Sequence, residues 1–392
     1  MEFLSLLLMI LGAAFFGVPG LYYVYLWRMS SKSWNLTIDN LHLPRVSVLI
    51  PAHNEEKTIR FKLLNISKVV YEKEKIQIIL VDDGSTDNTI IEARHFAQEH
   101  PELEFTIMQG QGRTGKSVAL NNALKIAKHD IIVVTDADTF WSRDILVQAL
   151  PFFSDVSVGA LSGRQTLLGS ERETLSTQTE RVYQDLTYGL IKLGESKIHS
   201  TIIYHGLFSA YSRKYLNEFN LETDDSGTAL DIVQNGGRTI FIPAAKCYEV
   251  PTRSWKAKIT TKLRRANQLL AIYGKCLKLL FSRRLRLPLR IAVPEVFIFL
   301  VNPTLFILLS ITILFFLATH LSYLMITVII LSFLLIIPSK FRLIFLEAVQ
   351  DYIVLFLALL FLVSGEKFSM WETLDESRSM LDENMLKRYN LI

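Results

Sequence analysis

The sequence predicts an α/β fold with a mainly parallel sheet, joined to a helical transmembrane region. Two observations predict it. Short apolar runs alternate with helix-like stretches between residues 45 and 250, and long stretches almost without charge precede and follow that region. We therefore expect an ordinary soluble domain at 45–250 within the 392 residues of the chain.

The elements of this domain follow from the pattern of apolar residues. The predicted strands lie at 46–50, 76–81, 105–108 and 131–135, and the helix-like stretches between them at 56–69, 89–98 and 117–128. Continuous apolar runs are typical of strands that are covered on both faces, which favours a parallel sheet. Ligands of such sheets bind beyond the carboxyl ends of the strands.

Three parts of the chain are predicted to meet the membrane. Residues 3–27 exceed the roughly 20 apolar residues that cross a bilayer, and they lack the basic start and cleavage site of a secretory signal, so we expect an uncleaved anchor at 1–30. Residues 251–290 have the mixed apolar and basic pattern of an amphipathic interfacial helix, which a surface helix packed on the domain shares. Residues 291–363 hold two or three spans, at 294–318, 321–337 and 343–363.

The last of these spans contains polar side chains that are costly in lipid, namely Glu347, Gln350 and Asp351. A polar tail follows at 364–392, and part of it, 371–378, is reminiscent of cytoplasmic tails. Three full spans after an inward-facing domain would place that tail outside. We therefore expect one stretch to be interfacial or re-entrant, and the sequence leaves open which one.

The net charge of +4 is modest, but its placement is informative. The basic residues that flank the apolar stretches are Arg28, Lys32, Arg283, Arg284, Arg286 and Arg290. Lys and Arg gather on the cytoplasmic side of membrane spans, which predicts a multi-pass protein of the cell membrane with its soluble domain inside. We expect no nucleic-acid binding, because no broad basic face with aromatic platforms is present. Cys247 and Cys276 lack metal or redox spacing, which argues against zinc and disulfides.

Polar side chains follow three of the predicted strands. They are His53, Asn54 and Glu55 after the first, Asp82 and Asp83 after the second, and Asp136 and Asp138 after the fourth. Two carboxylates one residue apart can bind one hard divalent ion, which commonly completes its shell with substrate phosphates. A lone Asp-x-Asp pattern occurs often by chance, but its place after a buried strand and beside other acidic pairs predicts a Mg²⁺ or Mn²⁺ site.

A second phosphate-binding pattern competes with this interpretation. Residues 110–117 (GQGRTGKS) fit the phosphate loop of nucleotide hydrolases and lie between a predicted strand and helix. However, the loop follows the third strand rather than the first. It also leaves Asp82, Asp83, Asp138 and the membrane spans without a role, so a membrane NTPase is the remote alternative.

The segments that carry these residues resemble family 2 glycosyltransferases. The resemblance covers roughly 45–270 and rests on VSVLIPAHNE (46–55), VDDGSTD (81–87), GKSVALN (115–121) and TDAD (135–138). That family has the Rossmann-like GT-A fold and includes dolichyl-phosphate mannose synthases and the cellulose, chitin, hyaluronan and poly-N-acetylglucosamine synthases. The resemblance implies an inverting enzyme with a UDP- or GDP-sugar donor and a divalent cation.

The resemblance also implies roles for individual residues. Pro51, Glu55, Asp82 and Asp83 would hold the nucleoside, Lys116 would lie near the donor, and Asp138 would lead metal binding with Asp136 on the donor. Asp83 is alternatively a turn residue or a helix cap. Residues 222–225 (ETDD) resemble the Thr-Glu-Asp motif of polysaccharide synthases, which makes Asp225 the candidate base; a solvated acidic loop is the alternative.

The acceptor side is less well defined by the sequence. Residues 206–213 (GLFSAYSR) resemble the acceptor-side segment, with Gly206, Tyr211 and Arg213 joined by Asp224. Processive relatives continue to a Gln-x-x-Arg-Trp motif. Here 261–265 (TKLRR) keeps Arg264, which would screen the donor diphosphate, but has Thr261 and Arg265 in place of Gln and Trp. This departure weakens the prediction of a polymer-forming enzyme.

We therefore expect a membrane-bound, metal-dependent glycosyltransferase. It would move a hexose or N-acetylhexosamine from a UDP- or GDP-sugar to a membrane lipid, a lipid-linked saccharide or a growing polysaccharide, with Asp225 accepting the acceptor proton. A processive synthase that also secretes its product is the next interpretation, and a non-catalytic sugar-nucleotide sensor is a third. The sequence leaves open the sugar, the acceptor, the linkage and the oligomeric state.

Overall fold

The computed structural model describes residues 2–110, 112–169, 174–184, 189–251, 254–320, 339–365, 378 and 381–392. The chain divides into two compact units. The first, called the sheet unit, contains Met29–Glu173, Lys192–Arg253 and Ser369–Ile392. The second, called the helical unit, contains Met1–Arg28, Thr174–Ile191 and Ser254–Phe368.

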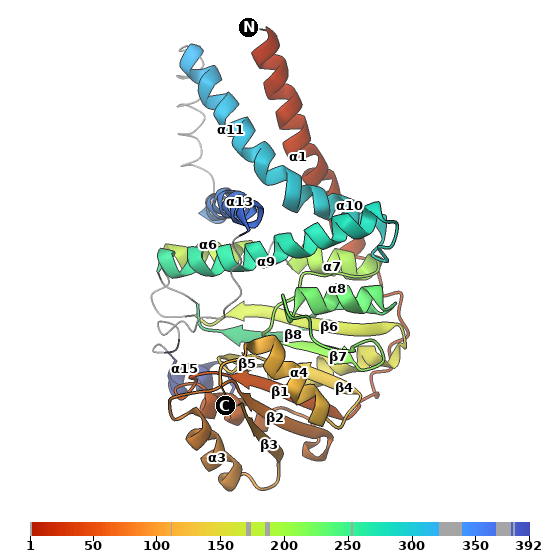
Figure 1. Cartoon of the computed structure of the whole chain (residues 1–392), viewed down its shortest axis with the longest axis vertical. Coiled ribbons are helices and arrows are strands. Elements are labelled where there is room, and N and C mark those ends of the chain that lie inside the picture. Colours follow the sequence, from red (N-terminus) through yellow and green to blue (C-terminus); the bar gives the residue numbers. More distant parts are fainter. Residues whose placement is uncertain are drawn as a thin grey trace. The chain divides into compact units, whose positions relative to one another are not determined.

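A mixed sheet forms the centre of the sheet unit (Figure 1). Among the described residues its order is β3-β2-β1-β4-β7-β6-β8-β5. The strands are β1 (Val46–Ala52), β2 (Ile76–Asp82), β3 (Glu104–Gln109), β4 (Ile131–Val134), β5 (Thr139–Trp141), β6 (Val158–Leu167), β7 (Ser209–Ser212) and β8 (Arg238–Glu249). The half β3-β2-β1-β4 is parallel, as predicted. The other half joins it through the antiparallel pair β4–β7, which the sequence pattern did not reveal.

Pro51 is tolerated inside β1 because the neighbouring strand is shorter there. The pairing of β1 with β4 ends at Leu49, whose carbonyl accepts a hydrogen bond from Thr135 N at 3.2 Å. Residues two apart in a strand point the same way, so the missing N–H of Pro51 faces the side on which β4 has ended. On the other side Pro51 stays in register with Val81 of β2. Proline is found in sheets at such unpaired positions.

Helices cover both faces of the sheet. The helices of the sheet unit are α2 (Ile59–Ser67), α3 (Thr89–Glu99), α4 (Lys116–Ile126), α5 (Ile145–Ala149), α8 (Ser226–Gln234) and α15 (Glu383–Arg388), with 3₁₀ turns at Lys73–Lys75 and Leu150–Ser154. Most of α7 (Gly189–Ile198) belongs to this unit too, and its first residues belong to the helical unit. Val48 of β1 is buried with Leu63 of α2, whereas the adjacent Leu49 is buried with Leu120 of α4. Alternate side chains of one strand therefore enter two separate cores, as the continuous apolar runs predict.

The helical unit contains α1 (Glu2–Ser30), α6 (Leu175–Tyr183), α9 (Trp255–Phe281), α10 (Leu289–Val296), a π-helical turn at Phe297–Val301, α11 (Asn302–Thr319) and α13 (Ser339–Ser364). Among the described residues, three helices are long and apolar enough to cross a membrane: Phe3–Ser30, Leu289–Thr319 and Phe341–Ser364. The predicted span at 321–337 lies outside the described residues. The predicted basic helix is found as α9.

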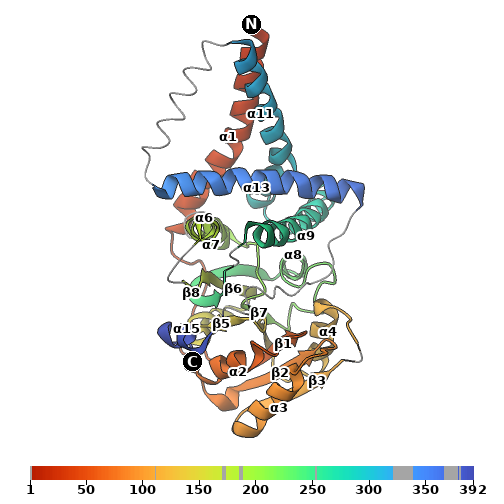
Figure 2. The same ribbon diagram turned by 90° about the vertical axis from the view of Figure 1, so that its left-hand side faces the viewer.

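Helix α13 runs across the long axes of α1 and α11 and packs on α6 and α9, as Figures 1 and 2 both show. Its acidic side chains are paired with lysines of α9. Glu347 is 1% exposed and accepts hydrogen bonds from Lys258 Nζ at 2.8 Å and Lys262 Nζ at 2.5 Å. Lys262 also forms an ion pair with Asp351. The charges that are costly in lipid are thus neutralised within the helical unit.

Candidate functional site

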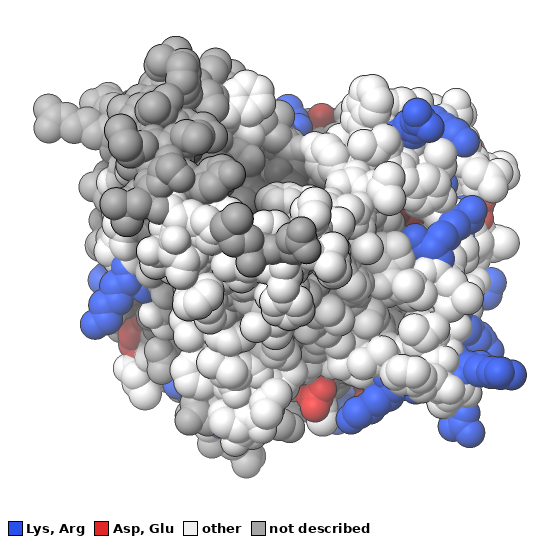
Figure 3. Space-filling view, turned by 90° about the horizontal axis from the view of Figure 1, so that it is seen from above, with Lys and Arg blue, Asp and Glu red and all other residues white. Residues whose placement is uncertain are grey.

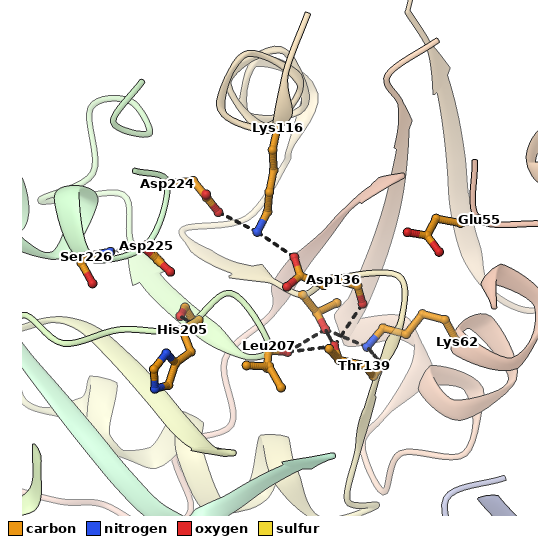
Figure 4. Close-up of polar contacts among 12 residues, drawn as sticks. Glu55, Lys62, Lys116, Asp136, Thr139, His205, Leu207, Asp224, Asp225 and Ser226 are labelled. Carbon is orange, nitrogen blue, oxygen red and sulfur yellow. Dashed lines mark hydrogen bonds and ion pairs between the residues drawn. The ribbon is translucent and has the colours of Figure 1, made fainter. Parts of the chain in front are cut away.

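Lys116 lies at the centre of the candidate site, at the carboxyl edge of the parallel half of the sheet. Gly115 has a φ of 97°, a left-handed conformation open to glycine, and the chain turns there into α4. The Lys116 Nζ lies 2.7 Å from Asp136 Oδ1 and 2.9 Å from Asp224 Oδ2 (Figure 4). Burial lowers the pKa of Lys116, but the two carboxylates outweigh burial and raise it. Lys116 is therefore a charged link between two motif segments.

Gly206 approaches this ion pair closely. A Cβ at position 206 would lie 2.6 Å from Lys116 Nζ, closer than real Cβ atoms approach, and 3.0 Å from Asp136 Oδ2, which is a tight contact. The preceding Tyr204 donates its N–H to Ser226 Oγ at 3.1 Å, which ties the Gly206 loop to the start of α8. The structure thus brings the expected acceptor-side glycine to the predicted donor residues.

Asp225 occupies the N-cap of α8, beside Asp224 (Figure 4). Its Oδ1 accepts a hydrogen bond from Ser226 N at 2.5 Å, and Thr223 Oγ1 accepts one from Gly227 N at 2.6 Å. The turn is therefore held in place by hydrogen bonds from its own side chains, while Asp224 and Asp225 stay half-buried. The candidate base and the Lys116 partner Asp224 are adjacent residues of this one turn.

The Asp-x-Asp segment follows β4 directly. Burial and the charge of Asp138 raise the pKa of Asp136, while Lys116 lowers it. In the part of the chain that the structure describes, no group of three or more His, Cys, Asp or Glu side chains could hold a metal ion. Asp138 is only partly buried, and hard carboxylate oxygens suit Mg²⁺ or Mn²⁺ with few protein ligands and substrate phosphates. The residues present therefore fit a divalent ion that is shared with a phosphorylated ligand.

Lys62 forms hydrogen bonds on both sides of this segment, and the sequence analysis did not predict its role. Its Nζ donates hydrogen bonds to Thr135 Oγ1 and to the Thr139 carbonyl, both at 2.7 Å, and lies 4.7 Å from the centre of the Trp141 ring. Figure 4 shows this lysine pointing at the Asp136 turn. Burial lowers the pKa of Lys62 to about 7, although the charge of Asp136 opposes this shift. The lysine fixes both ends of the Asp-x-Asp turn.

Asp83 holds the loop that resembles a phosphate loop. Its Oδ1 accepts hydrogen bonds from Thr114 N and Thr114 Oγ1, each at 2.7 Å, and its Oδ2 accepts one from Gly115 N at 2.8 Å. Asp82 accepts a bond from Ser85 N at 3.2 Å. Backbone N–H groups of a phosphate loop point at phosphates, but here two of them are used by Asp83. The loop therefore lacks the arrangement that the NTPase interpretation requires.

Glu55 is buried among protein partners. It is 0% exposed and accepts hydrogen bonds from Thr58 Oγ1 and from Arg378 Nε, each at 2.7 Å, and from Arg378 Nη2. Burial and the charge of Asp138 raise the pKa of Glu55 to about 8, while Arg378 and Thr58 lower it. Glu55 therefore ties the loop after β1 to Arg378. Direct contact of Glu55, or of the buried Pro51, with the donor stays a prediction.

Three further expected site residues have contacts of other kinds. Tyr211 is 1% exposed and packs in the core. Arg213 donates hydrogen bonds from Nη2 to the carbonyls of Leu124, at 2.8 Å, and Ala127, at 2.6 Å, at the end of α4. Acceptor contact by these two residues therefore stays a prediction without support from their packing. Arg264 lies on α9 in the helical unit, so its role at the donor also stays a prediction.

Comparison with known proteins identifies the family. Residues 44–268 match the family model for glycosyltransferase like family 2, which is more than half of the chain. The protein belongs to glycosyltransferase family 2. A solved structure of the mannosyltransferase PcManGT from Pyrobaculum calidifontis, in complex with GDP-Man and Mn²⁺, aligns with a TM-score of 0.74 and 30% identity over 91% of this chain and 99% of that one.

Curated relatives agree with this assignment. The probable glycosyltransferase YdaM of Bacillus subtilis (strain 168) is 30% identical over 252 residues, which are 62% of this chain and 57% of YdaM. The beta-monoglucosyldiacylglycerol synthase of Nostoc sp. is 33% identical over 129 residues, which are 33% of this chain and 28% of that enzyme. The chain thus spans less than two thirds of either relative.

The family and the alignment confirm the predicted GT-A fold and show that this family 2 glycosyltransferase is an enzyme. The interpretations as an NTPase and as a non-catalytic sensor are therefore set aside. Only the structure links the loops at Gly206 and Asp225, both in the sheet unit, to the donor motifs, because the sequence alone gives no contact between them.

Proposed function

We propose that this glycosyltransferase moves a hexose or N-acetylhexosamine from a UDP- or GDP-sugar to a hydroxyl group of a membrane lipid or lipid-linked saccharide. The observation that carries the proposal is the ion-paired group Asp136–Lys116–Asp224. It joins the donor motifs after β4 and before α4 to the turn that carries Asp225. A donor diphosphate and an acceptor hydroxyl would therefore meet at one edge of the sheet.

The proposed reaction is a single displacement. The Asp225 carboxylate takes the proton of the acceptor hydroxyl, while that oxygen bonds to the anomeric carbon. The bond from the anomeric carbon to the phosphate oxygen breaks on the opposite face, and its electrons leave with the nucleoside diphosphate. Lys116 is held charged by its two carboxylates and would sit near the donor, where positive charge favours departure of the diphosphate. Arg264 is proposed to add to that charge.

A divalent ion fits the proposal. Asp138, with Asp136, would hold Mg²⁺ or Mn²⁺, and the ion when bound would neutralise charge on the leaving diphosphate. The Mn²⁺ and GDP-Man in the PcManGT complex support a metal and a nucleotide-sugar. The Nostoc relative is named a beta-monoglucosyldiacylglycerol synthase, and that name supports a lipid acceptor. Thr261 and Arg265 in place of Gln and Trp weigh against a processive synthase.

The membrane arrangement is also proposed. Residues 378 and 381–392 belong to the same compact unit as the sheet. These residues and the sheet would therefore lie on one side of the bilayer, and the chain between the sheet and residue 378 would cross the bilayer an even number of times. Helix α13, with its paired acidic residues, would lie in the interface, while 289–319 would cross. The second crossing is left to the span that the sequence predicts at 321–337, outside the described residues. Seen from above, most of the described residues in view are uncharged, and Lys and Arg lie mainly toward the edge of the view (Figure 3). Flanking arginines favour a cytoplasmic sheet unit.

The test is a screen of nucleotide-sugars with the full-length protein purified in detergent. GDP-mannose, UDP-glucose and UDP-N-acetylglucosamine are each incubated with Mn²⁺ and extracted membrane lipids, and release of GDP or UDP is measured. We expect release with at least one donor, loss of release in EDTA, and a lipid product that carries one sugar. No metal-dependent release with any donor would contradict the proposal, and a long saccharide product would favour the processive synthase.

A further inference from the structure

The end of the chain is built into the sheet unit. The C-terminal segment, defined as Arg378 with residues 381–392, follows the membrane helices in sequence but belongs to the sheet unit. Leu386 and Leu391 are 0% and 1% exposed and share a buried cluster with Phe140 of β5. In Figures 1 and 2 α15 lies beside the sheet unit's β5. Burial of this kind argues for a lasting attachment rather than a loose tail.

Polar contacts attach the same segment to the strand that follows the Asp-x-Asp turn. Asn65 of α2 donates hydrogen bonds from Nδ2 to the Leu391 carbonyl at 2.7 Å and to the Trp141 carbonyl at 2.9 Å. Its Oδ1 accepts one from Trp141 N at 2.7 Å. The Tyr389 hydroxyl accepts a bond from Gly169 N at 2.7 Å. One amide side chain thus joins α2, β5 and the chain end.

Arg378 carries the contact nearest to the expected nucleoside site. It is 5% exposed and donates from Nε and Nη2 to the two oxygens of Glu55, which is 0% exposed. Paired hydrogen bonds between a guanidinium and a carboxylate fix direction as well as distance. A lone ammonium or amide cannot reproduce both bonds. Arg378 therefore determines how the Glu55 side chain is oriented.

The loop of Glu55 is connected to the donor motifs. Asn54 N donates to Ser85 Oγ at 2.9 Å, and Thr86 N donates to Asn54 Oδ1 at 2.8 Å. These bonds join the loop after β1 to the loop after β2. That second loop contains Asp83, which holds the segment leading into Lys116. A continuous set of contacts therefore leads from the chain end to the centre of the site.

We propose that Arg378 is a positioning residue for the nucleotide-sugar: the C-terminal segment sets the geometry of the β1 and β2 loops through Glu55, and so sets donor affinity. The inference rests on the proposed function, because these loops are where the nucleoside is expected to bind. It assigns the chain end to donor binding, although 323 residues separate the two partners of the ion pair. The segment acts through Glu55 and does not itself touch the reacting atoms.

The experiment compares four variants of the full-length protein with GDP-mannose and UDP-N-acetylglucosamine as donor probes, each with Mn²⁺. They are Arg378→Gln, Arg378→Lys, the double variant Glu55→Gln with Arg378→Gln, and the control Lys387→Gln. Lys387 lies in the same segment, but its ion pair with Glu383 is exposed, at 59% and 56%. The donor KM and kcat are measured separately, since a merely structural role would reduce the amount of active enzyme and lower kcat alone.

We expect Arg378→Gln to raise the donor KM about tenfold, equivalent to about 1.4 kcal/mol, with kcat changed less. Arg378→Lys should recover part of this loss, and Lys387→Gln should match the wild type. If Arg378→Gln does not fold, the donor KM of the double variant tests the inference instead, because that variant leaves no unpaired buried charge. Its donor KM should also be raised. A wild-type KM in the folded variant overturns the inference. If the wild type releases no nucleotide with GDP-mannose, UDP-glucose or UDP-N-acetylglucosamine, it is the proposed function that fails, rather than the inference about Arg378.

Discussion

Gly206 offers a sharp test of the site geometry. Replacing it with alanine adds one methyl group, which would lie 2.6 Å from Lys116 Nζ and 3.0 Å from Asp136 Oδ2. Ordinary contact begins at 3.4 Å, so either the lysine or the loop must move by about 0.8 Å at close packing. The neighbouring Tyr204 loop is held to Ser226, so we expect much of the movement to fall on the lysine.

The expected loss of activity follows from the larger distance between the charges of Lys116 and Asp136. If Nζ moves away from Asp136, their separation grows from 2.7 Å to roughly 3.5 Å. At an effective dielectric constant of about 20 the attraction falls from about 6.1 to about 4.7 kcal/mol. The loss is about 1.4 kcal/mol, or about tenfold in kcat/KM. The unfolding midpoint should change little, since only one side chain is displaced.

The assay is nucleotide release from the donor found in the screen, with Gly274→Ala as the matched control. Gly274 lies inside α9, and a Cβ there would meet nothing within 4 Å. We expect the control to retain wild-type kcat/KM, and Gly206→Ala to lose roughly five- to thirtyfold. If Gly206→Ala keeps wild-type kcat/KM while Lys116→Met loses it, the reasoning about this close approach is refuted.

Three other predictions concern buried charges and the metal. Lys62→Met should lower the free energy of unfolding by roughly 2–4 kcal/mol through two lost hydrogen bonds. Because burial lowers the pKa of Lys62 to about 7, the thermal midpoint of the wild type should rise with pH between about pH 7 and 10. If Lys62→Met keeps this rise with pH, Lys62 is not its cause. Glu347→Gln should destabilise the detergent-purified protein by about 3–5 kcal/mol by leaving Lys258 unpaired, and adding Lys258→Met should restore it; a failure to restore would speak against the pair. Asp138→Asn should raise the Mn²⁺ concentration for half-maximal nucleotide release, and an unchanged Mn²⁺ titration would exclude Asp138 as a ligand.

Local pattern was sufficient to predict the parallel half of the sheet. The runs at 46–50 and 76–81 are buried along the full length of β1 and β2, so their composition reflects their environment directly. The antiparallel half could not be read in this way. Strand β7 is four residues long and pairs with β4, from which it is distant in sequence. That pairing depends on tertiary packing rather than on local propensity.

The site was predictable where motifs carry it and not where support comes from distant residues. Lys62 left a weak signal: a helix with Ile59, Leu63 and Ile66 on its buried face places Lys62 on that face too. A buried lysine needs polar partners, which the sequence does not name. The segment 371–378 resembles cytoplasmic tails, but nothing in it indicates Glu55 as the partner of Arg378, because only folding brings the two residues together.

We propose that the Asp225 carboxylate is the base of a metal-dependent sugar transfer. The most direct measurement is the rate of transfer by Asp225→Asn, together with its donor dissociation constant. Asparagine is a good N-cap, so α8 should stay intact and only the charge is removed. We expect the transfer rate to fall by a factor of roughly 10²–10⁴ while donor affinity stays within about twofold. Transfer at the wild-type rate would contradict it.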